Sequence, residues 1–272
     1  MSAFTILGGR GFVGSHLARH LEARGLPYGC PERDDPSIFE RPLGHVIYCV
    51  GLTADYAKRP FDTVEAHVGL LARVLERSQL ESLVYLSSTR LYDALGPVAA
   101  REDAVLPLSV QQPRHLFDFS KGLGESLCLH GSKRARVARL SSVYAENLAS
   151  PNFLHQLIRA GVDGHATTLD TSATLARDYI DVEDVCALLV AIATAGRRPV
   201  YNVASGHNVT NGELLALIER ETGCRLTPSR PPAPDRSPLI DISAIVEDFG
   251  LRPRGVLERL PSILAHHRAG GL

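Results

Sequence analysis

A glycine-rich turn near the first residues constrains the fold of this chain more than any other feature. The apolar run 4–7 leads into the turn, whose glycines are Gly8, Gly9, Gly11 and Gly14. Apolar residues at helical spacing follow it, namely Phe12, Val13, Leu17 and Leu21. A strand, a tight turn and a helix in this order present free backbone N–H groups at the helix N-terminus, where they bind a pyrophosphate. The stretch therefore predicts a dinucleotide-binding site.

The three spaced glycines have distinct tasks in such a turn. Gly8 permits the tight bend, Gly11 lets the backbone approach the phosphates, and Gly14 lets the helix pack closely on the strand. Their spacing is G-x-x-G-x-x-G, which differs from the G-x-G-x-x-G of the standard fingerprint. We expect these glycines, together with Phe12 and Val13, to line the pyrophosphate site.

Strands and helices are predicted to alternate over the first 150 residues. After the glycine turn, strands are expected at residues 26–30, 46–50, 83–86 and 136–140, with helices at 60–75 and beyond 113. Continuous apolar strands such as 46–50 are typical of sheets that are buried on both faces. The pattern predicts an α/β fold in which residues 1–150 form a Rossmann-type, doubly wound parallel sheet.

The second part of the chain, residues 151–272, has a different pattern. It is predicted to form a small substrate-binding lobe, with some segments returning to the first domain. Helices are expected near residues 152–160, 184–195 and 211–222, with a short strand at 201–203. Residues 227–238 contain five prolines and are predicted to form a loop or an extended arm.

Composition excludes several classes of function. The net charge of the 272 residues is −1, which gives no electrostatic reason to expect binding to nucleic acid or to an anionic membrane. The five cysteines are widely spaced, without a C-x-x-C pair, and are expected to be reduced thiols. No apolar run is long enough to span a bilayer, and a strand is expected where a signal peptide would lie. We expect a cytoplasmic protein without a bound metal.

Five stretches in a fixed order carry a resemblance to one family. They are the glycine turn, 85–92 (YLSSTRLY), 117–121 (FDFSK, followed by Glu125), 177–185 (RDYIDVEDV) and, more weakly, 201–206 (YNVASG). The set resembles that of the extended short-chain dehydrogenase/reductases that act on nucleotide sugars. The resemblance implies a nicotinamide cofactor, a nucleoside-diphosphate sugar as substrate, and a homodimer formed by the helices around residues 60–78 and 113–131.

The resemblance also implies catalytic roles for three positions. Ser88 matches the hydroxyl that binds the reacting sugar oxygen. Lys121 matches the lysine that binds the nicotinamide ribose and lowers the pKa of a catalytic tyrosine, which belongs at position 117. Hydride transfer at a carbinol carbon requires a base for the hydroxyl proton, and a nearby ammonium group stabilises a phenolate near neutral pH.

Position 117 departs from the family pattern, because Phe117 has no proton to give or accept. In one interpretation, which the retained serine and lysine favour, the chain is an inactivated form in which phenylalanine has replaced tyrosine. In a second interpretation another acid acts, and the nearest candidates in sequence are His115, Asp118 and Tyr92. In a third, the protein binds nucleotide without turnover.

The reaction type is narrowed by Thr89 and Arg90, which follow Ser88 where the dehydratases of this family usually carry Asp-Glu. A 4,6-dehydratase is therefore not expected. The implied reaction is NAD(P)-dependent epimerisation or 4-ketoreduction of a nucleotide sugar, and the motifs do not separate these two. Two rival functions stay open: a non-catalytic protein that binds NAD(P) or a nucleotide sugar, and a reductase of a non-nucleotide ketone.

The choice of cofactor depends on residues near the end of the second predicted strand. Glu32 lies where an acidic residue would bind both ribose hydroxyls of NAD. Arg10 and Arg33 would instead bind the 2′-phosphate of NADP. We favour NADP over NAD. The other residues that we expect to contact the cofactor are Val50, Gly51 and Lys121.

The residues that the resemblance implies for substrate binding are Thr89, Ser142, Asn152, Arg177 and Arg236. Ser142 replaces an asparagine that commonly faces the nucleotide diphosphate in the family. The guanidinium of Arg177 suits bidentate binding of phosphate. An ion pair of Arg177 with Asp178 or Asp181 is the structural alternative. Arg236, in the proline-rich segment, is expected to reach the second phosphate.

Overall fold

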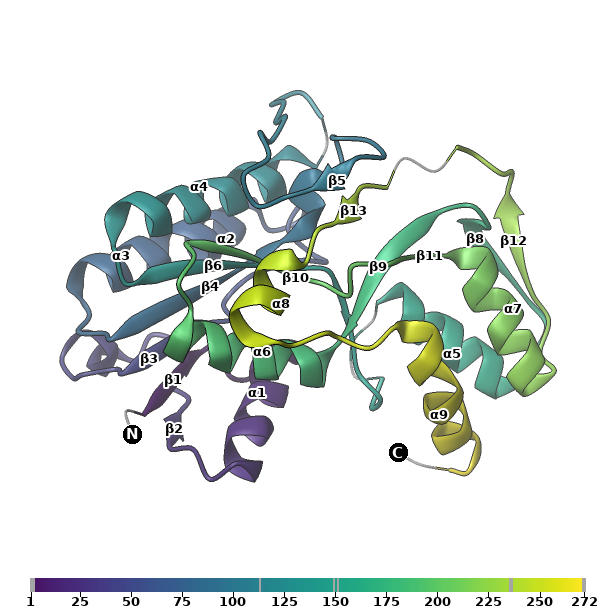
Figure 1. Cartoon of the computed structure of the whole chain (residues 1–272), viewed down its shortest axis with the longest axis horizontal. Coiled ribbons are helices and arrows are strands. Elements are labelled where there is room, and N and C mark those ends of the chain that lie inside the picture. The colour runs from purple at the N-terminus through teal and green to yellow at the C-terminus, as the bar shows by residue number, and fades with distance from the viewer. Residues whose placement is uncertain (1–2, 113, 149, 151, 235–236, 271–272) are drawn as a thin grey trace.

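A six-stranded parallel sheet forms the centre of the computed structural model, which describes residues 3–112, 114–148, 150, 152–234 and 237–270. In spatial order the strands are β10 (Val200–Val203), β6 (Ala135–Leu140), β4 (Ser82–Ser88), β3 (His45–Tyr48), β1 (Phe4–Leu7) and β2 (Tyr28–Gly29) (Figure 1). Every neighbouring pair in this sheet is parallel. The predicted α/β fold with a Rossmann-type sheet is confirmed.

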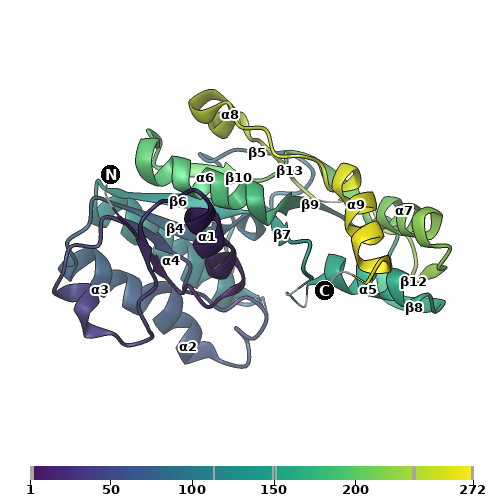
Figure 2. The same ribbon diagram turned by 90° about the horizontal axis from the view of Figure 1, so that it is seen from below.

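Helices cover both faces of the sheet, as Figures 1 and 2 show. One face carries α1 (Phe12–Ala23), α6 (Val182–Ala195) and α8 (Ser243–Phe249). The other face carries α2 (Pro60–Val64), α3 (Leu70–Arg77) and α4 (His115–Gly131). The apolar side chains of β1, β3 and β4 alternate between the two cores that these helices enclose, as expected for strands buried on both sides. The sheet is therefore doubly wound.

The helix predicted over residues 60–75 is interrupted in the structure. A π-helical turn at Glu65–Gly69 separates α2 from α3. It widens the helix where the side chain of His67 is fully buried. Such turns are frequent at functional sites, and this one directs His67 toward α4.

The later part of the chain builds a smaller layer beside the central sheet (Figure 1). Its strands are β7 (Ser142–Tyr144), β9 (Ala176–Asp181) and β11 (Asn208–Thr210) in one sheet, and β8 (Thr167–Ser172) with β12 (Leu226–Arg230) in a parallel pair. Its helices are α5 (Phe153–Asp163), α7 (Asn211–Thr222) and α9 (Val256–Arg268). No strand was expected in the polar run 163–176. Strand β8 forms there because pairing with β12 supplies hydrogen-bond partners for its backbone N–H and C=O groups. The local sequence alone does not indicate this pairing.

The chain crosses several times between the central sheet and the smaller layer. Helix α6 and strand β10 follow α5 in sequence but belong to the central sheet and its core, and α8 returns there before α9. Strand β13 (Leu239–Ile240) pairs in parallel with β5 (Ala99–Ala100), far from it in sequence. The division of the chain near residue 150 stays a prediction, since segments on both sides of it form the central sheet.

Membrane-spanning helices and metal clusters are absent from the part of the chain that the structure describes. No helix there has the length and apolar character needed to cross a bilayer. Nor are three His, Cys, Asp or Glu side chains grouped in these residues so as to hold a metal ion. All five cysteines are free.

Candidate active site

A cavity of about 440 Å³ lies between the central sheet and the smaller layer. It is lined by the glycine turn, by the ends of β3, β4 and β6, and by β9 and β13. Parallel sheets bind ligands at the carboxyl ends of their strands, which is where this cavity lies. The predicted cofactor residues that line it are Gly11, Phe12, Val13, Val50, Gly51 and Lys121.

The glycine turn has the shape that a pyrophosphate requires. Gly8 has φ = +86°, a conformation that favours glycine. A Cβ atom at Gly14 would overlap the carbonyl oxygen of Gly8 and lie 2.9 Å from the Cα of Gly9, so α1 packs on β1 only without a side chain there. Gly11 precedes α1, and no described side chain caps this helix, which leaves its first N–H groups to a ligand. The turn therefore fits a dinucleotide cofactor.

The residues expected to select the cofactor lie outside the cavity lining, as do Gly8 and Gly14. Arg10 and Glu32 form an exposed ion pair with each other. Within the described part of the chain, Arg33 has no ion pair. The acidic residue expected for NAD and one of the arginines expected for NADP are thus joined in a single pair.

Lys121 on α4 and Ser88 at the end of β4 both line the cavity. Lys121 is almost fully buried, and its Nζ donates a hydrogen bond to the carbonyl oxygen of Leu86 at 2.8 Å. Burial lowers the pKa of Lys121 to about 7, against the opposing effect of Glu125. Ser88 Oγ accepts a hydrogen bond from the N–H of Arg90 at 3.2 Å, so its own proton stays available to a ligand.

Phe117 lies one helical turn before Lys121, and its ring lines the same cavity. The ring centroids of Tyr56 and His67 lie 5.5 and 5.7 Å from that of Phe117. The guanidinium carbon of Arg90 lies 5.6 Å from the same centroid. The structure thus places position 117 beside the lysine and the serine, while the catalytic roles of these three positions stay predictions.

His67 connects the loop after β3 to α4. Its Nε2 accepts a hydrogen bond from the N–H of Leu52 at 3.1 Å, so its Nδ1 carries the proton and donates to Ser120 Oγ at 2.8 Å. Ser120 Oγ in turn donates to the carbonyl oxygen of Phe117 at 3.0 Å. Burial, followed by the charge of Lys121, lowers the pKa of His67 to about 3. The imidazole is therefore neutral and holds α4 in place between Phe117 and Lys121.

The three acids considered as substitutes for a tyrosine do not line the cavity. The hydroxyl of Tyr92 donates to Asn202 Oδ1 at 2.8 Å and accepts from Arg139 at 2.6 Å. Asp118 is paired with the arginine four residues before it, at 3.1 Å. The ring of His115 packs against that of the phenylalanine four residues later. Their nearness in sequence therefore does not bring them to the site.

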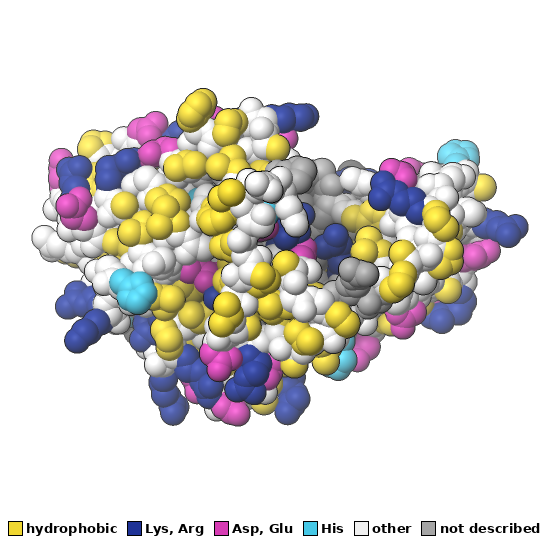
Figure 3. Space-filling model, turned by 90° about the horizontal axis from the view of Figure 1, so that it is seen from above, with side chains coloured by type: hydrophobic (Ala, Val, Ile, Leu, Met, Phe, Trp, Pro, Cys, Tyr) yellow, Lys and Arg dark blue, Asp and Glu magenta, His cyan; other side chains and the backbone are white. Residues whose placement is uncertain are grey.

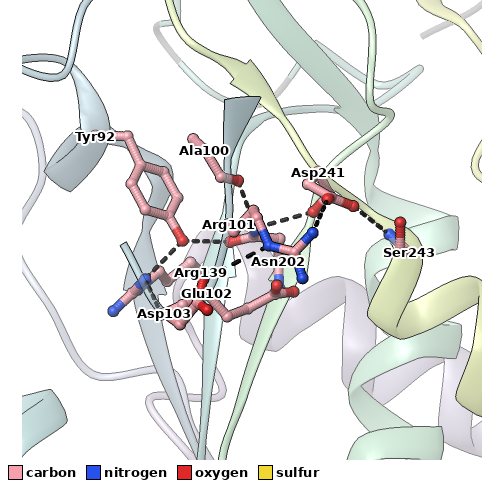
Figure 4. A network of polar contacts seen from close by, with 9 residues as sticks. All are labelled: Tyr92, Ala100, Arg101, Glu102, Asp103, Arg139, Asn202, Asp241 and Ser243. Atoms are coloured by element: carbon pink, nitrogen blue, oxygen red, sulfur yellow. Dashed lines mark hydrogen bonds and ion pairs between the residues drawn. The ribbon is translucent and has the colours of Figure 1, made fainter. Parts of the chain in front are cut away.

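A buried ion pair supports this part of α4. Arg139 on β6 donates to both carboxylate oxygens of Glu125, at 3.0 and 2.6 Å. The same carboxylate accepts a hydrogen bond from Ser87 Oγ at 2.5 Å. On its other side, shown in Figure 4, Arg139 donates to the hydroxyl of Tyr92, which reaches Asn202 on β10. The network ties α4 to three central strands beside the cavity.

The residues predicted to bind substrate have different surroundings. Those that line the cavity are Thr89, Ser142, Asn152 and Arg177. Arg236 lies outside the described residues. The amide of Asn152 is engaged within the protein, since its Oδ1 accepts from the N–H of His155 at 2.8 Å and its Nδ2 donates to the carbonyl oxygen of Val143 at 3.0 Å. Substrate binding by Asn152 stays a prediction.

Arg177 lines the cavity without an ion pair in the described part of the chain. Asp178 accepts hydrogen bonds from the backbone N–H groups of residues 205–207 and from Ser205 Oγ. Asp181 pairs with Arg259 at 3.1 Å and caps α6. The alternative in which Arg177 pairs with a neighbouring carboxylate is therefore wrong, and its guanidinium is left for an anionic ligand.

Arg90 also lines the cavity, although no binding role was predicted for it. Its place two residues after Ser88, at the end of a buried strand, was the available signal. In the sequence, Arg90 itself argues only against a 4,6-dehydratase. What the motif does not reveal is whether the guanidinium has a partner, because this depends on segments that lie far away in sequence.

Comparison with known proteins identifies relatives over nearly the whole chain. The family described as NAD dependent epimerase/dehydratase matches residues 4–204. A dTDP-4-dehydro-6-deoxy-D-allose reductase from a Streptomyces species is 23% identical, with 91% of each chain covered.

Solved structures share the fold. The structure of MoeE5 in complex with UDP-glucose and NAD has a TM-score of 0.81 and 21% identity, and the match covers 99% of both chains. The structure of RMD from Pseudomonas aeruginosa complexed with NADPH has a TM-score of 0.77 and 22% identity, covering 99% of this chain and 98% of that one. The resemblance of the motifs is thus confirmed, and the chain belongs to the NAD-dependent epimerase/dehydratase family of extended short-chain dehydrogenase/reductases.

Proposed function

We propose that the protein is an NAD(P)-dependent epimerase or 4-ketoreductase of a nucleoside-diphosphate sugar. The observation that carries this proposal is the single cavity in which Ser88, position 117 and Lys121 lie next to the glycine turn. A cofactor on that turn and a sugar over Ser88 would meet there. The relatives support the assignment, since one is a dTDP-sugar reductase and one solved structure holds UDP-glucose together with NAD.

The residues that line the cavity would have different roles in the reaction. When bound, the nicotinamide supplies or accepts the hydride. Ser88 would hold the reacting oxygen with the proton that its contact to Arg90 leaves free. Lys121 would bind the ribose and keep a positive charge near position 117. Arg177 would bind the diphosphate, because it has no counter-ion among the described residues. Since Phe117 offers no proton, we infer that turnover by the present chain is slow.

The test is to incubate the protein with NADPH or NADH, each carrying deuterium at the transferred position of nicotinamide C4, and with UDP- and dTDP-linked 4-keto sugars. We expect slow transfer of deuterium to the sugar carbon, and faster transfer from NADPH because Arg10 and Arg33 are proposed to bind its 2′-phosphate. NMR spectra of the sugars detect the transfer. The same spectra follow epimers formed from UDP- and dTDP-hexoses, because an epimerase regenerates its cofactor.

Binding of cofactor and nucleotide sugar without any product, both in this chain and in its Phe117→Tyr form, would contradict the proposal. That result would favour a non-catalytic binding protein, the second candidate, which the phenylalanine at position 117 supports. Transfer to simple ketones but to no nucleotide sugar would favour the reductase of a non-nucleotide ketone instead. Faster transfer from NADH would identify NAD as the cofactor.

We also propose a homodimer through α2 to α4. An apolar groove on this side is lined by Val64, Val68, Phe119, Leu123 and Leu129. Leu123 is 52% exposed, and Val64, Phe119 and Leu129 beside it in the groove are also exposed. A contiguous exposed apolar patch of this kind marks a surface that a partner covers. Figure 3 views the molecule from the side of α4 and shows apolar side chains over that side. Helices 60–78 and 113–131 of two copies would bury these side chains in a four-helix interface.

Leu123→Glu is expected to convert the dimer to a monomer, because a carboxylate would be buried at the centre of the interface. Sedimentation velocity measures the change. The matched control is Leu251→Glu, which places the same charge at an exposed leucine outside the groove and is expected to leave the dimer intact. A monomeric parent chain would refute the proposed dimer directly.

A cytoplasmic location is part of the proposal, since free cysteines suit a reducing compartment. Recovery of the protein in the membrane or exported fraction of its source cells would contradict it.

A further inference from the structure

Arg90 presents a positive charge to the cavity without a counter-ion of its own. Its Nε atom is buried and has no hydrogen-bond partner. Among the described residues, no carboxylate forms an ion pair with its guanidinium. Burial, and then the charge of Arg114, lower the pKa of Arg90, but an arginine stays protonated at neutral pH. Arg90 as a whole is half-buried. A charge that is partly withdrawn from water without a counter-ion is unfavourable, so this arrangement indicates that a ligand supplies the negative charge.

The two carboxylates that line the same cavity are already engaged. Asp93 pairs with Arg114 at 2.5 Å. Asp178 accepts the backbone N–H groups of residues 205–207. Arg114 also donates from Nη2 to the carbonyl oxygen of Arg90 at 3.0 Å, which fixes the backbone at this position. Arg90 is therefore held in place without being neutralised.

The location of Arg90 distinguishes it from Arg177, the other unpaired guanidinium of the cavity. Its guanidinium carbon lies 5.6 Å from the ring centroid of Phe117, and its backbone N–H binds Ser88 Oγ at 3.2 Å. It therefore stands at the end of the cavity where the proposed reaction occurs. Arg177 comes from β9 in the smaller layer and is the residue proposed for the diphosphate. A second anionic group is thus needed near the sugar.

We propose that Arg90 binds a carboxylate carried by the sugar itself, so that the substrate is a nucleoside-diphosphate uronate. The inference rests on the proposed function. The planar fork of a guanidinium matches a carboxylate through two parallel hydrogen bonds. The C6 carboxylate of a uronosyl unit supplies this group without altering the hydroxyls at the reacting carbon. The face of the Phe117 ring beside Arg90 adds a cation–π attraction that keeps the side chain over the sugar end.

Calorimetric titration of the NADP-bound protein with UDP-glucuronate, UDP-glucose and UDP tests the assignment, and dTDP-linked sugars repeat it for the other base. We expect the uronate to bind about tenfold more tightly than the hexose, as charge-assisted hydrogen bonds allow. Arg90→Gln is expected to remove that preference and leave UDP-glucose binding unchanged. Arg90→Lys, which keeps the charge but loses the fork, is expected to retain part of it.

Arg177→Gln is the matched control and is expected to weaken all three ligands together, because each contains the diphosphate. Equal weakening of UDP, UDP-glucose and UDP-glucuronate by Arg90→Gln would assign Arg90 to the diphosphate and overturn the inference. An unchanged preference for the uronate in Arg90→Gln would overturn it as well. If no nucleotide sugar bound at all, the proposed function itself would be wrong. This outcome is distinct from those that contradict the uronate assignment alone.

Discussion

Replacing Phe117 with tyrosine is expected to raise the rate of hydride transfer by about 10²- to 10⁴-fold, the usual contribution of a positioned general acid or base. The new hydroxyl would extend from a ring that already lines the cavity, one helical turn before Lys121. A protonated Lys121 would favour the phenolate at this position, and its pKa of about 7 lets it do so at or below neutral pH. Deuterium transfer from labelled cofactor to the sugar, followed by NMR, measures the rate.

Phe119→Tyr is the matched control for this gain. It adds the same hydroxyl to the same helix at a residue that lines the outer groove and not the cavity. We expect it to leave the rate unchanged. Equal, measurable rates in Phe117→Tyr and in the parent chain would show that another group already supplies the proton, and the assignment of position 117 would then be wrong.

Replacing Arg139 with methionine is expected to destabilise the fold by about 3–5 kcal/mol, the range found when one partner of a buried ion pair is removed. Methionine keeps much of the side-chain volume, so the loss would come from the charge left on Glu125. That carboxylate would retain the hydroxyl of Ser87 as a hydrogen-bond donor. The hydroxyl of Tyr92 would lose a donor in the same step. Urea unfolding followed by circular dichroism measures the change in the free energy of unfolding.

Two further variants test whether burial is the cause. Arg230→Met breaks an exposed pair with Asp170 and is expected to cost less than about 1 kcal/mol. The double variant Arg139→Met/Glu125→Met is expected to recover part of the stability lost in Arg139→Met, because neither charge is then left without its partner. A cost below about 1 kcal/mol for Arg139→Met alone would contradict the buried ion pair.

The central sheet is predictable because its strands carry their own signal. Buried parallel strands such as β3 and β4 are continuous apolar runs, and the glycine turn marks where the first strand ends. Two of the shortest strands, β5 and β13, are not predictable in this way. β5 and β13 have two residues each and exist only because segments near residues 99 and 239 meet in space. β8 likewise depends on its pairing with β12, and no pattern in its own sequence predicts that pairing.

The residues of the candidate site likewise fall into those that the sequence predicts and those whose state only the tertiary structure shows. Ser88 and Lys121 could be named from the sequence because the stretches that contain them, 85–92 and 117–121, resemble motifs of the family. The free state of Arg177 could not be predicted, since it depends on residues 205–207 and on Arg259 engaging the carboxylates beside it. That Arg90 has no carboxylate partner could likewise not be predicted, because tertiary contacts decide which groups the nearby carboxylates Asp93 and Asp178 bind.

The repeated crossing of the chain between the central sheet and the smaller layer has a consequence for its folding during synthesis. Strand β10 and helices α6 and α8 all come from sequence beyond residue 150, yet they complete one side of the central sheet and much of one of its faces. A nascent chain of 150 residues would leave the outer edge of β6 unpaired and apolar surface exposed. The central sheet and the helices that cover it therefore cannot finish folding on the ribosome until Phe249, at the end of α8, has been synthesised.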